Sequence, residues 1–126
     1  MRGKGAFYFD LTAAPIGAAG MAAVANPEGA DLIITRFMVV TTTAAAGATT
    51  IDAGVAADAV TTSDTLLDGV TVNAVGLRDN IQDQAGNGLD ATLWGANQFI
   101  TVQKTAGGAL SEVGLVAKAY VEYVQV

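Results

Sequence analysis

The amino-acid sequence predicts an all-β protein, an antiparallel β-sandwich that is jelly-roll-like. Thr and Val, which favour strands, occur 14 times each, whereas the abundant Ala and the 15 Gly suit close packing and turns. Short apolar runs are separated by turn signals at fairly even intervals, and no run has the periodicity of a long helix. An immunoglobulin-like sandwich is the second choice, because the Cys…Trp…Cys landmark of those domains is missing.

The stretch Asp31–Thr43 is the strongest strand candidate. It is the longest bulky and β-branched run without Gly or Pro, and only Arg36 interrupts it. Apolar side chains occur at both odd and even positions, which predicts a strand covered on both faces. One parity holds Leu32, Ile34, Met38 and Val40, and the other holds Ile33, Phe37 and Val39.

Residues 1–12 are expected to form either a first strand or an N-terminal arm, and residues 13–126 a single β-sandwich domain. The segment contains three adjacent aromatic residues, Phe7-Tyr8-Phe9, which cannot all face one small core. An ordinary first strand is favoured. The alternative is an arm that docks on a neighbouring subunit.

The rest of the chain alternates between strand and turn patterns. Asn26–Gly29 predicts a turn, because Pro27 fixes φ and Gly29 accepts a positive φ. Hydroxyl, acidic and leucine residues before a glycine predict at most one short helical turn near Ser63–Gly69. Strands are also expected within Ala13–Asn26 (or an extended crossover there), Thr49–Ala57, Val70–Val75, Leu89–Trp94, Ala96–Thr105 and Leu115–Val126, with turns at Gly86–Gly88 and Ala106–Gly108.

Charge and composition argue against several classes of function. The chain has 12 acidic and 6 basic residues, a net charge of −6, which disfavours nucleic acid as a partner. It has no histidine, the commonest general base and transition-metal ligand, and no cysteine. No segment reaches the roughly 20 apolar residues of a membrane helix, and Asp10 lies where the apolar region of a secretory leader would begin. We therefore expect no enzyme, no nucleic-acid partner and no membrane partner.

Four aspartates, Asp52, Asp58, Asp64 and Asp68, recur within one short segment. One interpretation is a calcium site, because hard cations take several carboxylate and carbonyl oxygens. The spacing matches no EF-hand loop, however, and capping and turn roles explain Asp64 and Asp68. We expect no metal at these residues.

A second acidic group, Asp79, Asp83 and Asp90, lies close in sequence to Trp94. Two of these carboxylates could serve glycoside hydrolysis, with the indole as a sugar platform. Any acidic β protein offers such trios, and a single tryptophan is more often a core or interface residue. The two serines have no histidine to activate them. We expect no catalytic residue and no cofactor.

The expected interaction residues are aromatic or basic. Phe7, Tyr8 and Phe9 are the first candidates for a contact with another protein, followed by Trp94. Arg36 is alone within the central strand, so its guanidinium must emerge at a strand edge or pair with a carboxylate. Pairing with Asp31 or Glu122 is favoured, and a contact with another subunit is the alternative.

Several segments have sequence patterns that are similar to those of one class of protein. They are Leu32–Arg36, Thr49–Ala56, Asp64–Gly69, Asp79-Asn80 and Ala117–Val124, spread over Leu32 to Val126. In these segments the chain resembles small structural proteins of tailed-bacteriophage virions, particularly head decoration (cement) proteins. The resemblance implies a sandwich or jelly roll without catalysis, made in the host cytoplasm, that binds the major capsid protein at the capsid surface as a dimer or trimer. A tail or fibre-base protein and a glycan-binding sandwich are the alternatives.

Overall fold

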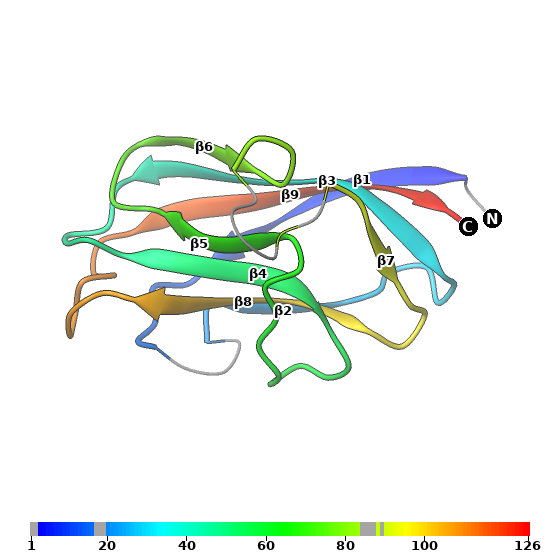
Figure 1. Cartoon of the computed structure of the whole chain (residues 1–126), viewed down its shortest axis with the longest axis horizontal. Helices are drawn as coiled ribbons and strands as arrows, with labels where there is room; N and C mark the ends of the chain where they lie inside the picture. The colour runs from blue at the N-terminus through cyan, green and yellow to red at the C-terminus, as the bar shows by residue number, and fades with distance from the viewer. Residues whose placement is uncertain (1–2, 17–19, 84–87, 89) are drawn as a thin grey trace.

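The computed structural model describes residues 3–16, 20–83, 88 and 90–126, and this part of the chain is all-β (Figure 1). The prediction of an all-β class is confirmed. The segment expected to hold at most one helical turn has bends at residues 65 and 66 and then continues as a strand. No described residue belongs to a helix that could cross a membrane. The strands are β1 (Lys4–Leu11), β2 (Ala22–Ala25), β3 (Leu32–Thr43), β4 (Thr50–Ala56), β5 (Leu67–Thr71), β6 (Gly76–Asp79), β7 (Thr92–Trp94), β8 (Phe99–Ala106) and β9 (Val116–Gln125).

These strands form two antiparallel sheets that pack against each other (Figure 1). Sheet A has the order β1-β9-β3-β6, with the short β7 also paired to β3, and sheet B has the order β2-β8-β4-β5. The pairs β1–β9, β2–β8, β3–β6 and β4–β5 are nested along the chain, like one long hairpin folded over on itself. This nesting is the jelly-roll arrangement, with β7 as an addition. The predicted jelly-roll-like sandwich is confirmed.

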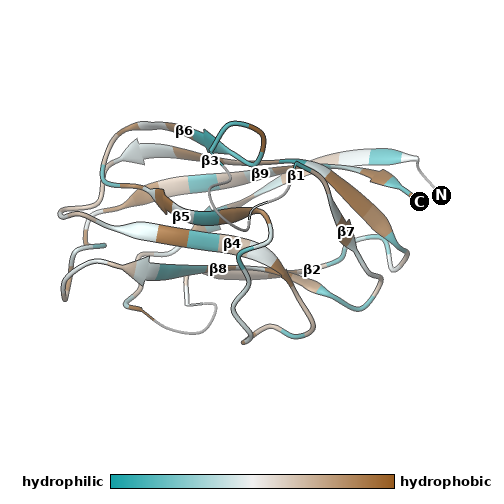
Figure 2. Ribbon diagram, in the orientation of Figure 1, coloured by the Kyte–Doolittle hydropathy of each residue, from teal (hydrophilic) through white to brown (hydrophobic). Residues whose placement is uncertain are grey.

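The core lies between the two sheets, because side chains alternate between inside and outside along each strand. In Figure 2 a teal band on β4 lies next to a brown one, as expected for neighbouring residues on opposite faces of the sheet. In sheet A, the central strand β9 has a buried residue at every second position between its neighbours β1 and β3. The residues without exposed surface include Val39, Ala119 and Val121 from sheet A and Ile51, Ala53, Ile100 and Val102 from sheet B.

A β-bulge in β3 changes which parity of side chains points inward. The register against β9 shifts between Ile34 and Arg36, which leaves Thr35 as the extra residue. Ile34 is the last inward residue before the bulge, and Phe37 and Val39 are buried after it. Side chains on the other face of β3 are half-buried or exposed. The prediction of a strand covered on both faces is therefore wrong. The bulge moves the inward-facing side chains from even-numbered to odd-numbered residues, so a strand with one buried face has apolar residues at both.

The N-terminal segment is a strand of this chain rather than a detached arm. β1 pairs with β9 in an unbroken antiparallel register and forms one edge of sheet A. The backbone N–H of Gln125 donates to the carbonyl of Gly3 at 2.7 Å, so the two ends of the chain lie side by side (Figure 1). Alternation along β1 turns Phe7 and Phe9 toward the core and leaves Tyr8 outside.

The turn at Asn26–Gly29 forms as predicted. Gly29 has a φ of 65°, and Asn26 Oδ1 accepts hydrogen bonds from the backbone N–H groups of Glu28 and Gly29. The Asn26 amide also donates to the carbonyl of Trp94, which connects the turn to β7. The predicted turn at Gly86–Gly88 lies mostly outside the described residues, and the described part of the expected strand Leu89–Trp94 forms β7 at its end.

Candidate interaction surface

The strands of sheet A carry large apolar side chains that are exposed on its outer face, whereas the strands of sheet B carry none of that exposure. Five large apolar residues that lie in strands are exposed, and their register places all of them on this one face. The strands of sheet B are all described and contribute no large apolar residue of that exposure. Because exposed apolar patches often mark interaction sites, this face is the candidate interaction surface. The five are Tyr8, Leu77, Leu93, Val116 and Tyr120.

Tyr8 and Tyr120 form an aromatic pair on this face, at the edge of the sheet formed by β1 and β9. They are directly opposite each other on β1 and β9, and their ring centroids are 5.7 Å apart. Lys118 Nζ lies 4.8 Å from the centroid of the Tyr8 ring and 2.7 Å from Asp10 Oδ1. The hydrogen bond to Asp10 raises the pKa of Lys118, so the ammonium stays charged beside the rings. Met38 on β3 extends the same row of outward side chains.

Two shallow hollows adjoin this aromatic pair. The first is lined in part by Ala6, Tyr8, Met38 and Tyr120, and the second by Lys4, Ala6 and their neighbours on β9. Ala6 contributes only a methyl group between the larger outward side chains of Lys4 and Tyr8, which leaves a depression in the face. Open hollows of this kind suit contact with another macromolecule better than enclosure of a small ligand.

The predicted contact residues separate into exposed and buried positions. Tyr8 is 59% exposed and remains a candidate. Phe7 and Phe9 are half-buried and pack on the core, with Phe7 6.2 Å from the Trp94 ring and Phe9 6.3 Å from the Phe37 ring. Trp94 has no exposed surface, and its Nε1 donates to the carbonyl of Gln98. Its prediction as a contact residue is therefore wrong, because a partner cannot reach it, and the buried indole agrees with the core position that we favoured over a sugar platform.

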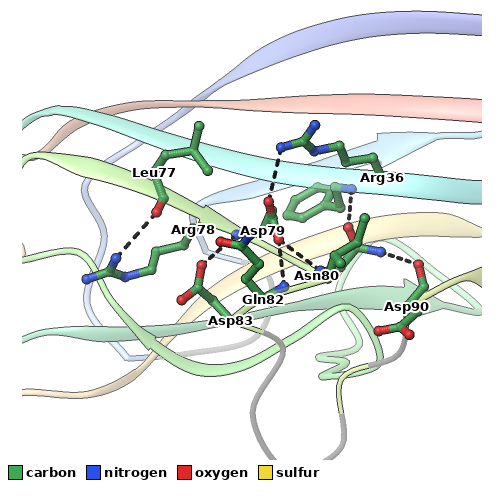
Figure 3. A network of polar contacts seen from close by, with 10 residues as sticks. Arg36, Leu77, Arg78, Asp79, Asn80, Gln82, Asp83 and Asp90 are labelled. Atoms are coloured by element: carbon green, nitrogen blue, oxygen red, sulfur yellow. Dashed lines mark hydrogen bonds and ion pairs between the residues drawn. The ribbon is translucent and has the colours of Figure 1, made fainter.

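Arg36 forms an ion pair inside the chain, but neither predicted partner supplies the carboxylate. Its Nη2 lies 3.1 Å from Asp79 Oδ2 (Figure 3). Glu122 is its register partner on β9, and Asp31 accepts a hydrogen bond from the backbone of Ala96 instead. The Arg36 side chain is 40% exposed, so contact with another subunit stays a prediction.

Asp79 and Asn80 complete the sheet where β6 and β7 leave a gap along β3 (Figure 3). Asn80 Oδ1 accepts from the backbone N–H of Phe37 at 2.8 Å, and the backbone N–H of Asn80 donates to the carbonyl of Phe37. The Asn80 amide also donates to the carbonyl of Asp90. Sequence reasoning missed this role, because an Asp-Asn pair after a short strand carries only a general turn signal.

Two of the three carboxylates considered for glycoside hydrolysis, those of Asp79 and Asp83, have structural roles. Asp79 Oδ1 accepts from the backbone N–H groups of Ile81 and Gln82, and Asp83 Oδ2 accepts from the backbone N–H of Asp79. Burial acts to raise the pKa of Asp79, but these N–H groups and Arg36 outweigh it, so the pKa lies below its usual value. An ionised, fully engaged carboxylate is a poor general acid.

Three of the four aspartates considered as a calcium site come together on the outer face of sheet B. One carboxylate oxygen from each of Asp52, Asp64 and Asp68 lies within 4.8 Å of the others. Burial, followed by the charges of Asp68 and Asp64, raises the pKa of Asp52 against the lowering effect of the Gly69 N–H. Asp58 stays apart and accepts from the backbone N–H groups of Val60 and Thr61, as a turn residue does.

A buried ion pair closes one end of the sandwich. Lys104 is 2% exposed, and its Nζ lies 2.7 Å from Glu112 Oε2 and 2.9 Å from the carbonyl of Gly108. Beside it, the Thr49 hydroxyl donates to Ser111 Oγ at 2.9 Å. The hydrogen bond from Lys104 holds the pKa of Glu112 below its usual value. Sequence reasoning missed this pair. Lys104 is directly opposite the buried Ile51 and therefore points inward, but this follows only from the register between β4 and β8.

No family model, curated protein or solved structure matches this chain.

Proposed function

We propose that this chain is a non-enzymatic structural protein of a phage virion that binds and stabilises the capsid lattice as a decoration (cement) protein. The outer face of sheet A is the proposed contact surface. The observation that carries the proposal is the concentration of every exposed, strand-borne large apolar residue of the described chain on this one face. The resemblance of Leu32–Val126 to head decoration proteins names the kind of partner, the major capsid protein.

The composition and the shape of the surface support this choice. A chain without histidine and cysteine lacks the side chains that most enzymes use for acid–base and nucleophilic chemistry. The paired Tyr8 and Tyr120, with Met38 beside them, are residue types that are enriched in protein interfaces. Additives that bind only the assembled shell stabilise it by mass action, and many copies multiply a weak contact. Assembly as a dimer or trimer, measured by sedimentation, remains part of the proposal.

The test is co-sedimentation with heads of the tailed phage whose genome encodes the chain, after existing additives are removed. Saturable binding at a fixed number of copies per head is expected. The double variant Tyr120→Ser with Leu93→Ser should weaken binding by about tenfold or more, because it removes two apolar anchors. The matched control is Val60→Ser with Val75→Ser, which removes two exposed apolar residues outside the strands and should bind as the wild type does.

Other outcomes would overturn the proposal. Equal loss of binding in both double variants would show that the outer face of sheet A is not the contact. Binding to isolated tails but not to heads would assign the chain to the tail or fibre base. Binding to a glycan array, abolished by Tyr8→Ala, would instead favour a glycan-binding module that uses the exposed ring rather than the buried Trp94.

A further inference from the structure

We propose that the outer face of sheet B holds a calcium site formed by Asp52, Asp64, Asp68 and the side-chain carbonyl of Gln103. The proposal is independent of the contact surface on sheet A, because the two lie on opposite sides of the sandwich. It also goes beyond the sequence analysis, in which capping and turn roles for Asp64 and Asp68 were favoured over a calcium site. Within the described residues there is no helix for Asp64 and Asp68 to cap.

The strand register brings the four residues together. Asp52 lies between the buried residues Ile51 and Ala53 of β4, so its side chain points away from the core. A bulge between β4 and β5 places Asp68 and Gly69 opposite Asp52. The backbone N–H of Gly69, at a φ of 71°, donates to Asp52 Oδ1 at 2.7 Å and orients that carboxylate.

The third carboxylate comes from the segment 57–66, which folds over the same face. A Cβ added to Gly54 would collide with Ser63 Oγ and would lie 2.6 Å from the Thr65 backbone N, so this segment lies directly on β4. Thr65 Oγ1 accepts from the backbone N–H of Val55 at 3.1 Å. Asp64, between these two anchors, is therefore held above Asp52.

Gln103 supplies the observation that points to a ligand. It is directly opposite Asp52 on β8 and shares the outer face, because Val102 on the one side and Lys104 on the other point inward. Gln103 is 4% exposed, and its Oε1 is buried without a hydrogen-bond donor. A buried amide oxygen without a partner is costly, whereas the same oxygen is a good ligand for a hard cation.

The set of ligands favours calcium. Three carboxylates and an amide oxygen form an all-oxygen site, which excludes a preference for the softer transition metals. Mg²⁺ keeps several waters and rarely uses a site composed of this many protein oxygens, whereas Ca²⁺ accepts irregular oxygen ligands. Three carboxylates within 4.8 Å of one another repel, and a divalent cation removes that repulsion.

The test is calorimetric titration of the EDTA-treated full chain with CaCl2. One Ca²⁺ per chain is expected, together with a melting temperature higher in CaCl2 than in NaCl of equal ionic strength. Asp52→Asn, Asp64→Asn and Asp68→Asn should each weaken binding by about tenfold or more. The matched control is Asp58→Asn, which removes a carboxylate from the same segment but outside the cluster and should bind as the wild type does.

Gln103→Leu gives the sharpest result, since it removes the buried oxygen and keeps most of the volume. It should raise the melting temperature of the calcium-free protein and lower the affinity for Ca²⁺. The proposal is overturned if CaCl2 has no effect beyond that of NaCl, if MgCl2 binds equally well, if D58N loses as much affinity as D52N, or if Q103L binds Ca²⁺ unchanged. Far-ultraviolet circular dichroism verifies that each variant is folded, and D64N lies outside the strands and tests the site should D52N not fold.

Discussion

The guanidinium of Arg36 pairs with Asp79 on β6 and not with Glu122, although Glu122 is its register partner on β9. The pair is unequal, since the Arg36 side chain is 40% exposed and that of Asp79 only 4%. Asp79 also receives two backbone hydrogen bonds from the turn that follows β6. The carboxylate therefore organises the turn, and the arginine adds to an anion site that already exists.

The first prediction follows from this inequality. Asp79→Ala should lower the free energy of unfolding by about 2–3 kcal/mol, because it leaves two backbone donors without their acceptor. Arg36→Gln should cost about 1 kcal/mol or less, as exposed ion-pair partners do. Urea denaturation followed by circular dichroism measures both. Equal losses in the two variants would show that the ion pair, rather than the turn, is the stabilising element.

The second prediction concerns pH. Because the pKa of Glu112 is lower in the folded protein than its ordinary value of 4.5, the folded state binds its proton less tightly than the unfolded state. Its contribution to stability is therefore complete above about pH 4.5 and is lost as pH falls through the lower pKa of the folded protein. Glu112→Gln should be less stable at pH 7 and should lose less stability between pH 7 and 3. Urea denaturation at a series of pH values measures this slope.

A salt series serves as the control for that measurement. Lys104 and Glu112 are both buried, so NaCl should change their contribution little, whereas it screens exposed pairs such as Asp10–Lys118. A wild-type pH slope that disappears in high salt would contradict the assignment to the buried pair.

The third prediction uses the single tryptophan of the chain. Trp94 has no exposed surface and lies against Phe7, so its emission should be blue-shifted and poorly quenched by acrylamide until the protein unfolds. Trp94→Ala should lower the free energy of unfolding by about 3–5 kcal/mol through the cavity that it leaves. Trp94→Phe should retain much of that stability. Native emission at the wavelength of free tryptophan would contradict the buried position.

The sequence was sufficient for the fold class, since strand formers, turn residues and alternation are local signals. It could not reveal the bulge at Thr35. Apolar residues at both odd and even positions are expected for a strand buried on two faces, and also for a strand buried on one face whose register shifts at a bulge. In the same way, alternation places Phe7 and Phe9 on one face of the first strand and Tyr8 on the other, but it does not show which face is buried. The choice of which face is inside depends on a partner strand more than a hundred residues away, as Phe7↔Val121 shows.

The site residues were harder to predict, because each depends on the register between distant strands. Arg36 on β3 pairs with Asp79 on the neighbouring strand β6, and Lys104 on β8 pairs with Glu112 in the turn before β9. Asp52 and Asp68 are visible in the sequence as members of a group of four aspartates, but their proximity requires the β4–β5 bulge. Gln103, without charge or motif, carried no signal at all. These relationships are non-local, so composition and spacing do not contain them.

The pairing of Gly3 with Gln125 makes the ends of the chain available for engineering. A protein or epitope attached next to either Gly3 or Gln125 should emerge from the same corner of the sandwich, so a label at one of these positions can replace a label at the other. A short flexible linker between the two ends would also permit circular permutation, with the new ends opened in an exposed loop such as that around Val60 and all strand pairings retained.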